Sequence, residues 1–116
     1  MPGRDAHLDR AAHNEAFLET LSPGYQDWAV VATFYAALHY VDAALAVGDQ
    51  HPRGHAQRQW EVTRHGVLGG IANDFRTLYF RCNDARYQLV PVQPKDIAVE
   101  FESVKKAVLG YLEAVP

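Results

Sequence analysis

Three polar side chains follow one another at helical spacing within an otherwise apolar stretch. Tyr35, His39 and Asp42 are separated by steps of four and three residues, so on a helix they lie on one side. A buried polar group without a partner costs about 1–3 kcal/mol, so each of them needs a hydrogen-bond partner or a ligand. Two interpretations follow: a hydrogen-bonded network inside the core, or the wall of a functional pocket.

A second cluster of ionisable side chains lies in the next segment of the chain. It reads His51-Pro-Arg-Gly-His55, with Arg58 three residues further on. The two histidines have a spacing that helix-borne metal ligands use, but the proline and glycine between them predict a loop, and no supporting carboxylate or cysteine has ligand spacing nearby. His39 and Asp42 could complete a metal site. The neighbouring arginines favour an anion over a cation, so we expect neither a metal nor a cofactor.

The distribution of charge singles out the same region. The net charge of −3 argues against general nucleic-acid binding. Residues 51–90 nevertheless hold six arginines, no lysine and three acids, which gives +3, whereas residues 1–50 carry −5 and residues 91–116 carry −1. Arginine suits bidentate contacts to phosphate or carboxylate. This segment therefore predicts either a phosphate site or ion pairs with the acidic N-terminal half.

These side chains lead to two predicted sites. The first is an anion site near the N-terminus of the third helix, where free backbone amides favour phosphate. Its candidate members are His39, His51, His55, Arg58 and Arg81. The second is a structural polar network of Tyr35, Asp42, Arg86 and Tyr87, in which Arg86 faces inward and pairs with a carboxylate, Asp42 being the leading candidate.

Five helices are expected to position these residues, at about 5–20, 25–47, 55–65, 73–88 and 94–112. The turn at Ser22-Pro-Gly24 ends the first helix and Gly48 ends the second, while Asn73 or Asp74 can cap the fourth. We read the whole chain, 1–116, as one all-α domain, an antiparallel bundle of four to five helices.

The apolar periodicity of each helix predicts the face that it buries. The predicted core residues are Leu8, Ala12, Ala16 or Phe17, and Leu21 in the first helix; Trp28, Val31, Phe34, Leu38, Val41 and Leu45 in the second; Phe75, Leu78, Tyr79, Cys82 and Leu89 in the fourth; and Ile97, Phe101, Val104, Val108 and Leu112 in the last. The lone cysteine, Cys82, is expected to be a small buried apolar group.

Several segments occur in an order that resembles a known domain. They are Phe34-Tyr-Ala-Ala-Leu-His-Tyr40, Arg58, Leu78-Tyr79, Ala85-Arg-Tyr87 and the closing amphipathic helix. Together they resemble the HEPN domain, a small all-α domain of prokaryotic nucleases, toxins and nucleotidyltransferase partners. The resemblance implies a homodimer. Catalytic members carry an arginine followed four to six residues later by a histidine; Arg81 has the arginine's place, and Arg86 stands five residues on.

An arginine at the histidine's position cannot act as a base near neutral pH. The leading interpretation is therefore a non-enzymatic HEPN-like module that binds a nucleotide, RNA or a protein partner, with a nucleotidyltransferase or an antitoxin as the partner that the resemblance implies. The alternatives are a metal-independent endoribonuclease or toxin of a toxin–antitoxin system, with His39 or His65 as the base, and a purely structural dimerising protein. No apolar leader follows Met1, so we expect a cytoplasmic protein without a membrane span.

Overall fold

The structure, a computed structural model, describes residues 2–88 and 91–115. The helices are α1 (Arg4–Thr20), α2 (Gln26–Val47), α3 (His55–Arg64), α4 (Ala72–Asn83) and α5 (Ala98–Ala114). Short 3₁₀ turns occur at Pro23–Tyr25, Leu68–Ile71 and Pro94–Asp96, and α4 continues into a π-helical segment at Asp84–Gln88. These two ranges contain no strand, which confirms the all-α class.

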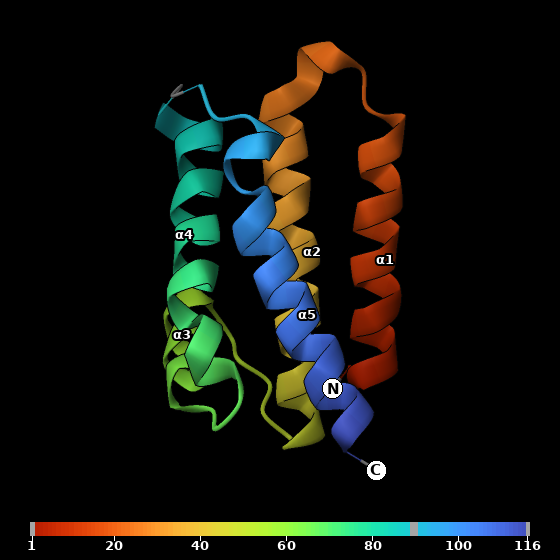
Figure 1. The fold of residues 1–116 in the computed structure, drawn as a ribbon, viewed down its shortest axis with the longest axis vertical. Coiled ribbons are helices and arrows are strands. Elements are labelled where there is room, and N and C mark those ends of the chain that lie inside the picture. Colours follow the sequence, from red (N-terminus) through yellow and green to blue (C-terminus); the bar gives the residue numbers. More distant parts are fainter. Residues whose placement is uncertain (1, 89–90, 116) are drawn as a thin grey trace.

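The helices form a bundle around α2 (Figure 1). α1 runs alongside α2 in the opposite direction, α4 runs antiparallel to α2 on its other side, and α5 lies across the front of α2 in this view. α3 is short and lies beside the beginning of α4. Consecutive long helices are therefore antiparallel, as short connections require.

The core is built from the apolar stripes of α2, α4 and α5. Thirteen of the 22 residues of α2 are buried, which identifies it as the central helix. The stripes predicted for α4 and α5 are largely confirmed: Phe75, Leu78 and Cys82 are buried in α4, as are Ile97, Phe101, Val104 and Val108 before and within α5. Tyr79 and Leu112 are partly buried and pack against the core. Leu89 lies outside the described residues.

The predicted inner face of α1 is confirmed at Leu8, which packs against the core, and is wrong at Ala12, Ala16 and Phe17. Of the described residues of α1, Ala11 alone is buried, while Ala12, Ala16 and Phe17 are exposed. Polar contacts instead attach this helix: the Tyr40 hydroxyl donates to Glu15, which also accepts from Lys105 Nζ at 2.9 Å. The apolar residues of α1 are few and irregularly spaced, so its two faces differ little in hydrophobicity.

Trp28 and the start of α4 also differ from expectation. Trp28 is 54% exposed although it falls on the predicted stripe; it lies in the first turn of α2 and lines two surface hollows, one with Phe17 of α1 and one with residues 85–87 after α4. α4 begins at Ala72 with Ile71 at its N-cap position, directly after the turn at Leu68–Ile71. Neither Asn73 nor Asp74 is therefore the cap.

α2 is long and apolar enough to cross a membrane by composition. Most of it is buried by the other helices of the bundle, an environment typical of a core helix in a folded domain. Its alanines let neighbouring helices approach closely, and the polar side chains of Thr33 and Asp42 are buried within the protein.

His65 organises the connection between α3 and α4. Its Nδ1 accepts hydrogen bonds from the backbone amides of Val67 and Leu68, both at 3.1 Å, and its ring meets Tyr111 of α5 edge-on. An Nδ1 that accepts two hydrogen bonds must be unprotonated. Burial lowers the pKa of His65 below its usual value of 6.5, which favours the same neutral form.

We therefore expect His65 to make the bundle sensitive to acid. A histidine whose pKa is lower in the folded than in the unfolded state stabilises the fold fully above about pH 6.5, and this contribution is lost as pH falls through the folded-state pKa. Thermal melts should show a smaller loss of stability between pH 7.5 and pH 5 for His65→Ala than for the wild type. Equal losses in the two proteins would contradict the assignment.

Candidate functional site

A buried ion pair joins α2 to α3. Asp42 and Arg58 are 7% and 8% exposed, and Arg58 binds the carboxylate with two nitrogens. Nε donates to Oδ1 at 2.7 Å and Nη2 donates to Oδ2 at 3.2 Å. A bidentate arginine–carboxylate pair fixes both side chains. Asp42 is therefore paired with Arg58, and the predicted pair of Asp42 with Arg86 is wrong.

His55 extends this pair towards α4. Its Nδ1 lies 3.4 Å from Arg58 Nη1, and its ring packs against Tyr79 at 4.7 Å and against Phe34 at 5.7 Å between centroids. Burial, together with the positive charge of Arg58, lowers the pKa of His55. The imidazole is therefore neutral near pH 7, with Nδ1 turned towards a donor.

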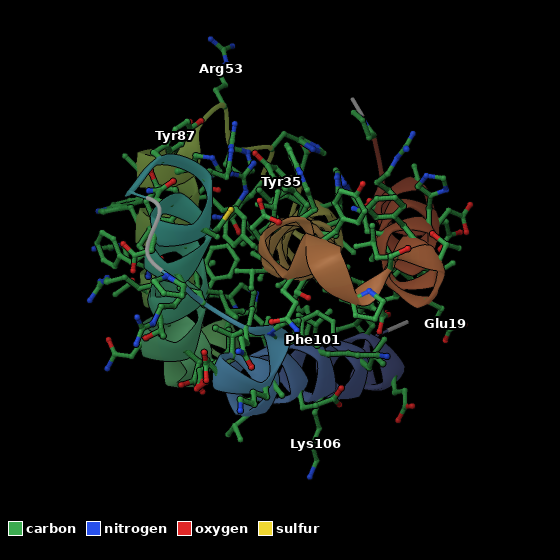
Figure 2. The ribbon with its side chains drawn as sticks, turned by 90° about the horizontal axis from the view of Figure 1, so that it is seen from above. Glu19, Tyr35, Arg53, Tyr87, Phe101 and Lys106 are labelled. Carbon is green, nitrogen blue, oxygen red and sulfur yellow. The ribbon has the colours of Figure 1, made fainter. Side chains whose placement is uncertain are left out.

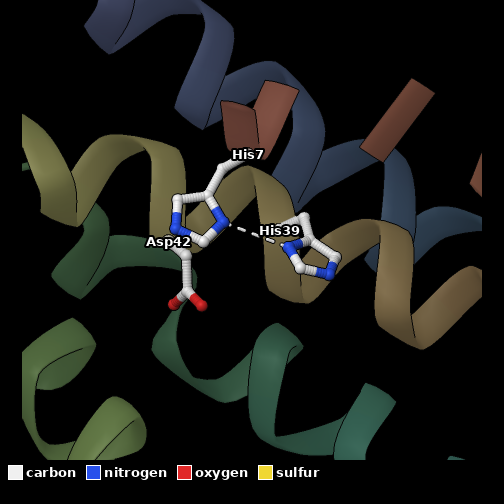
Figure 3. A group of neighbouring side chains, drawn as sticks. All are labelled: His7, His39 and Asp42. Atoms are coloured by element: carbon white, nitrogen blue, oxygen red, sulfur yellow. Dashed lines mark hydrogen bonds between the residues drawn. The ribbon is translucent and has the colours of Figure 1, made fainter. Parts of the chain in front are cut away.

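Two further histidines meet on the other side of Asp42. His7 of α1 and His39 of α2 place their Nδ1 atoms 3.1 Å apart (Figure 3). Burial lowers the pKa of both, and each lies near enough to Asp42 for the carboxylate to oppose that shift. We call His7, His39, Asp42, His55 and Arg58 the polar cluster. His7 was not predicted, because an isolated histidine on a polar helix carries no signal in a single sequence.

His51 lies beside the polar cluster, in the loop after α2. The loop turns at Asp49, whose φ of 59° is left-handed, while the amide of Gln50 donates back to Leu45 O at 3.0 Å. This arrangement is a common way to end a helix. It brings His51 Nε2 within 3.0 Å of Asp49 Oδ1 and close enough to His7 to lower the pKa of that histidine.

Arg86 and Tyr87 lie at the surface, contrary to the predicted network. Arg86 is exposed; it donates to the Tyr35 hydroxyl at 3.2 Å and stacks on the ring of Tyr87, which is 62% exposed. The cause is the π-helical segment, since its wider turn shifts the register that a continuous α-helix would have given these residues. Tyr35 therefore contacts Arg86, but neither joins Asp42.

Arg81 does not join the predicted anion site. It is exposed on α4, and its described ion pair, at 3.6 Å, is with Asp84 in the next turn. The structure thus gathers His39, His55 and Arg58, places His51 beside them, and leaves Arg81 apart. Arg58 is in addition neutralised by Asp42, so the anion site as predicted is wrong in its central contact. Cys82 is buried, which raises the pKa of its thiol to about 11 and confirms its interpretation as an apolar group.

A hollow of about 190 Å³ opens between α3 and α4, next to the polar cluster. It is lined by His55, Ala56, Gln59, Phe75, Arg76, Tyr79 and Phe80. His55 is part of the polar cluster and also lines this hollow, because its ring lies between Arg58 and the hollow. We call the hollow the α3–α4 pocket.

Exposed arginine and aromatic side chains are frequent on α3, α4 and the segments that flank them, and Arg76 and Phe80 are the ones that line the α3–α4 pocket. Trp60 and Phe80 are 59% and 56% exposed, and the guanidinium of Arg64 lies 4.7 Å above the Trp60 ring. The exposed arginines of α3, α4 and the π-helical segment are Arg64, Arg76, Arg81 and Arg86. Arg53, just before α3, points away from the bundle, and Tyr87 lies on the outer side at the end of α4 (Figure 2).

No protein-family model, curated protein or solved structure matches this chain. The resemblance to the HEPN domain therefore stays a prediction, and so do the homodimer, the nucleotidyltransferase or antitoxin partner, and the cytoplasmic location that were inferred from the sequence.

Proposed function

We propose that the protein is a non-enzymatic module that binds single-stranded RNA through a nucleobase held in the α3–α4 pocket. The observation that carries the proposal is the combination of Phe80, Tyr79 and Arg76 around one hollow. Aromatic rings provide stacking surfaces for unpaired bases, and arginine contacts the adjoining phosphate.

The charge around the pocket supports this proposal. Residues 51–88 carry six arginines against three acids, although the whole chain has a net charge of −3. Arg58 is paired with Asp42 inside the protein, whereas Arg76 is exposed and lines the pocket, where it can contact a phosphate. The aromatic rings at the pocket itself are those of Tyr79 and Phe80, and Phe80 is 56% exposed. Aromatic rings beside a cationic side chain are typical of sites that bind single strands with little sequence preference.

Titration with a fluorescently labelled RNA oligomer tests the proposal. We expect Phe80→Ala to weaken binding by about 5- to 150-fold, because loss of one stacked base costs about 1–3 kcal/mol. Arg76→Ala should weaken binding and reduce the slope of log K against log salt by about 0.7, the value for one phosphate contact to a single strand.

Two control variants remove comparable groups elsewhere. Lys106 points into solvent from α5, on a different side of the bundle (Figure 2), and Val99 is 78% exposed. Lys106→Ala and Val99→Ala should bind RNA like the wild type. The proposal fails if the wild type does not bind at low salt, or if Lys106→Ala and Arg76→Ala have equal effects.

A second function, cleavage of RNA, is favoured by one observation. His55 lines the α3–α4 pocket, and its lowered pKa favours the neutral imidazole. It can accept a proton from a substrate in the tautomer whose Nε2 is free, which gives up the contact of Nδ1 with Arg58. If the protein is instead a metal-independent endoribonuclease, RNA incubated in EDTA will be cleaved, and His55→Ala will abolish the cleavage. Intact RNA in that assay supports the binding module.

A further inference from the structure

The side chains of His7, His39 and Asp42 converge from two helices. One ligand atom from each can be chosen such that all three atoms lie within 4.8 Å of one another. His7 comes from α1, while His39 and Asp42 are three residues apart on α2 and share one side of that helix. Figure 3 shows the two imidazole rings facing each other, with the Asp42 carboxylate beyond the His7 ring.

The spacing of the two imidazoles resembles that of metal ligands. Two nitrogens bound to one Zn²⁺ at about 2.0–2.1 Å and at the tetrahedral angle are about 3.3–3.4 Å apart. The Nδ1 atoms of His7 and His39 are 3.1 Å apart. In a metal-free pair one nitrogen must carry a proton directed at the other. A cation between the rings would bind the lone pairs of both Nδ1 atoms, and the two nitrogens would move slightly further apart.

Asp42 has lone pairs left for a cation while it is paired with Arg58, but its oxygen would have to move towards the two nitrogens. The three ligand atoms are grouped within 4.8 Å, whereas those of one tetrahedral Zn²⁺ are about 3.3–3.5 Å apart. A carboxylate offers about four lone-pair positions, and Arg58 uses two of them. Metal-bound carboxylates are commonly held by a hydrogen-bonding partner in this way. The guanidinium also places a positive charge near the site, which lowers its affinity for a cation.

We propose that His7, His39 and Asp42 form a site for a divalent transition metal ion of the Zn²⁺ type. Two imidazoles and one carboxylate are a ligand set suited to such ions rather than to Ca²⁺ or Mg²⁺, which prefer oxygen. Three protein ligands leave a fourth position for water. The ion would tie α1 to α2, and this site is independent of the proposed RNA binding.

Calorimetric titration of the untagged protein with Zn²⁺ at pH 7.5 tests the proposal. A polyhistidine tag must be removed because it would bind the same ion. We expect one Zn²⁺ per chain, displacement of Zn²⁺ by EDTA, and a rise in the melting temperature on adding the ion. Co²⁺ in place of Zn²⁺ should give the visible absorption of a low-symmetry site.

Variants of each histidine identify the ligands. Loss of a partner that only orients a ligand costs about 10- to 100-fold in metal affinity, so His7→Asn and His39→Gln should each lose at least that much. The control is His13→Asn, which changes an exposed histidine on α1. Circular dichroism must show that the variants keep the wild-type helix content. The proposal is overturned if the wild type binds no Zn²⁺ at micromolar concentration, which would leave a hydrogen-bonded histidine pair, or if all three variants bind it alike.

Discussion

Replacing Arg58 with alanine is expected to lower the free energy of unfolding by about 3–5 kcal/mol, because it leaves the Asp42 carboxylate buried without its partner. Both side chains are 9% exposed, and two hydrogen bonds join them. Water cannot replace the guanidinium without opening the contact between α2 and α3. Urea denaturation followed by circular dichroism measures the loss.

Two comparisons distinguish the loss of the Asp42–Arg58 ion pair from the general effect of removing an arginine. Arg64 is on the same helix but exposed, so Arg64→Ala should change stability by less than about 0.5 kcal/mol. The double variant Arg58→Ala/Asp42→Ala should lose less than the sum of the two single variants, because neither charge is left alone. A loss below about 1 kcal/mol for Arg58→Ala would show that the pair is not buried in solution.

Phe34→Ala is expected to cost about 3–5 kcal/mol, the range for removing a large aromatic side chain from a packed core. Phe34 is 1% exposed and stands where three helices meet. Its ring packs on Phe75 at 5.8 Å and on Tyr79 and His55 at 5.7 Å between centroids. The same denaturation experiment measures the change.

The matched control for Phe34 is Phe80, which is 56% exposed. Phe80→Ala removes the same atoms from a surface position and should leave stability within about 0.5 kcal/mol of the wild type. A folded Phe80→Ala variant is also what the RNA-binding experiment requires. If the two phenylalanine variants are equally stable, the packing around Phe34 is not as described.

The helices and much of the core could be predicted because they depend on local periodicity. The stripe Ile97, Phe101, Val104 and Val108 identifies its own buried face, whatever it packs against. α1 has few apolar residues, so its periodicity identifies Leu8 correctly but not Ala11, which is buried in place of Ala12. Trp28 fits the stripe of α2 but faces the surface hollows at the end of that helix, and periodicity alone does not show which part of a stripe is covered.

The site was harder to predict because it depends on which helices meet. The sequence indicates that Asp42 is buried and needs a partner. It does not show whether that partner is an arginine of α3 or one of the segment after α4. The partner is Arg58, since α3 packs where Asp42 lies and the π-helical segment turns Arg86 to the surface. The contact of His7 with His39 spans 32 residues and leaves no periodic signal.

The weak apolar attachment of α1 has a consequence for how the polar cluster assembles. The described residues of the other helices supply most of the buried apolar groups. If α1 opened locally, His7 would separate from His39 and Glu15 from Tyr40, whereas the contact of Asp42 with Arg58 involves α2 and α3 alone. Only the His7 half of the cluster therefore depends on the docking of the N-terminal helix.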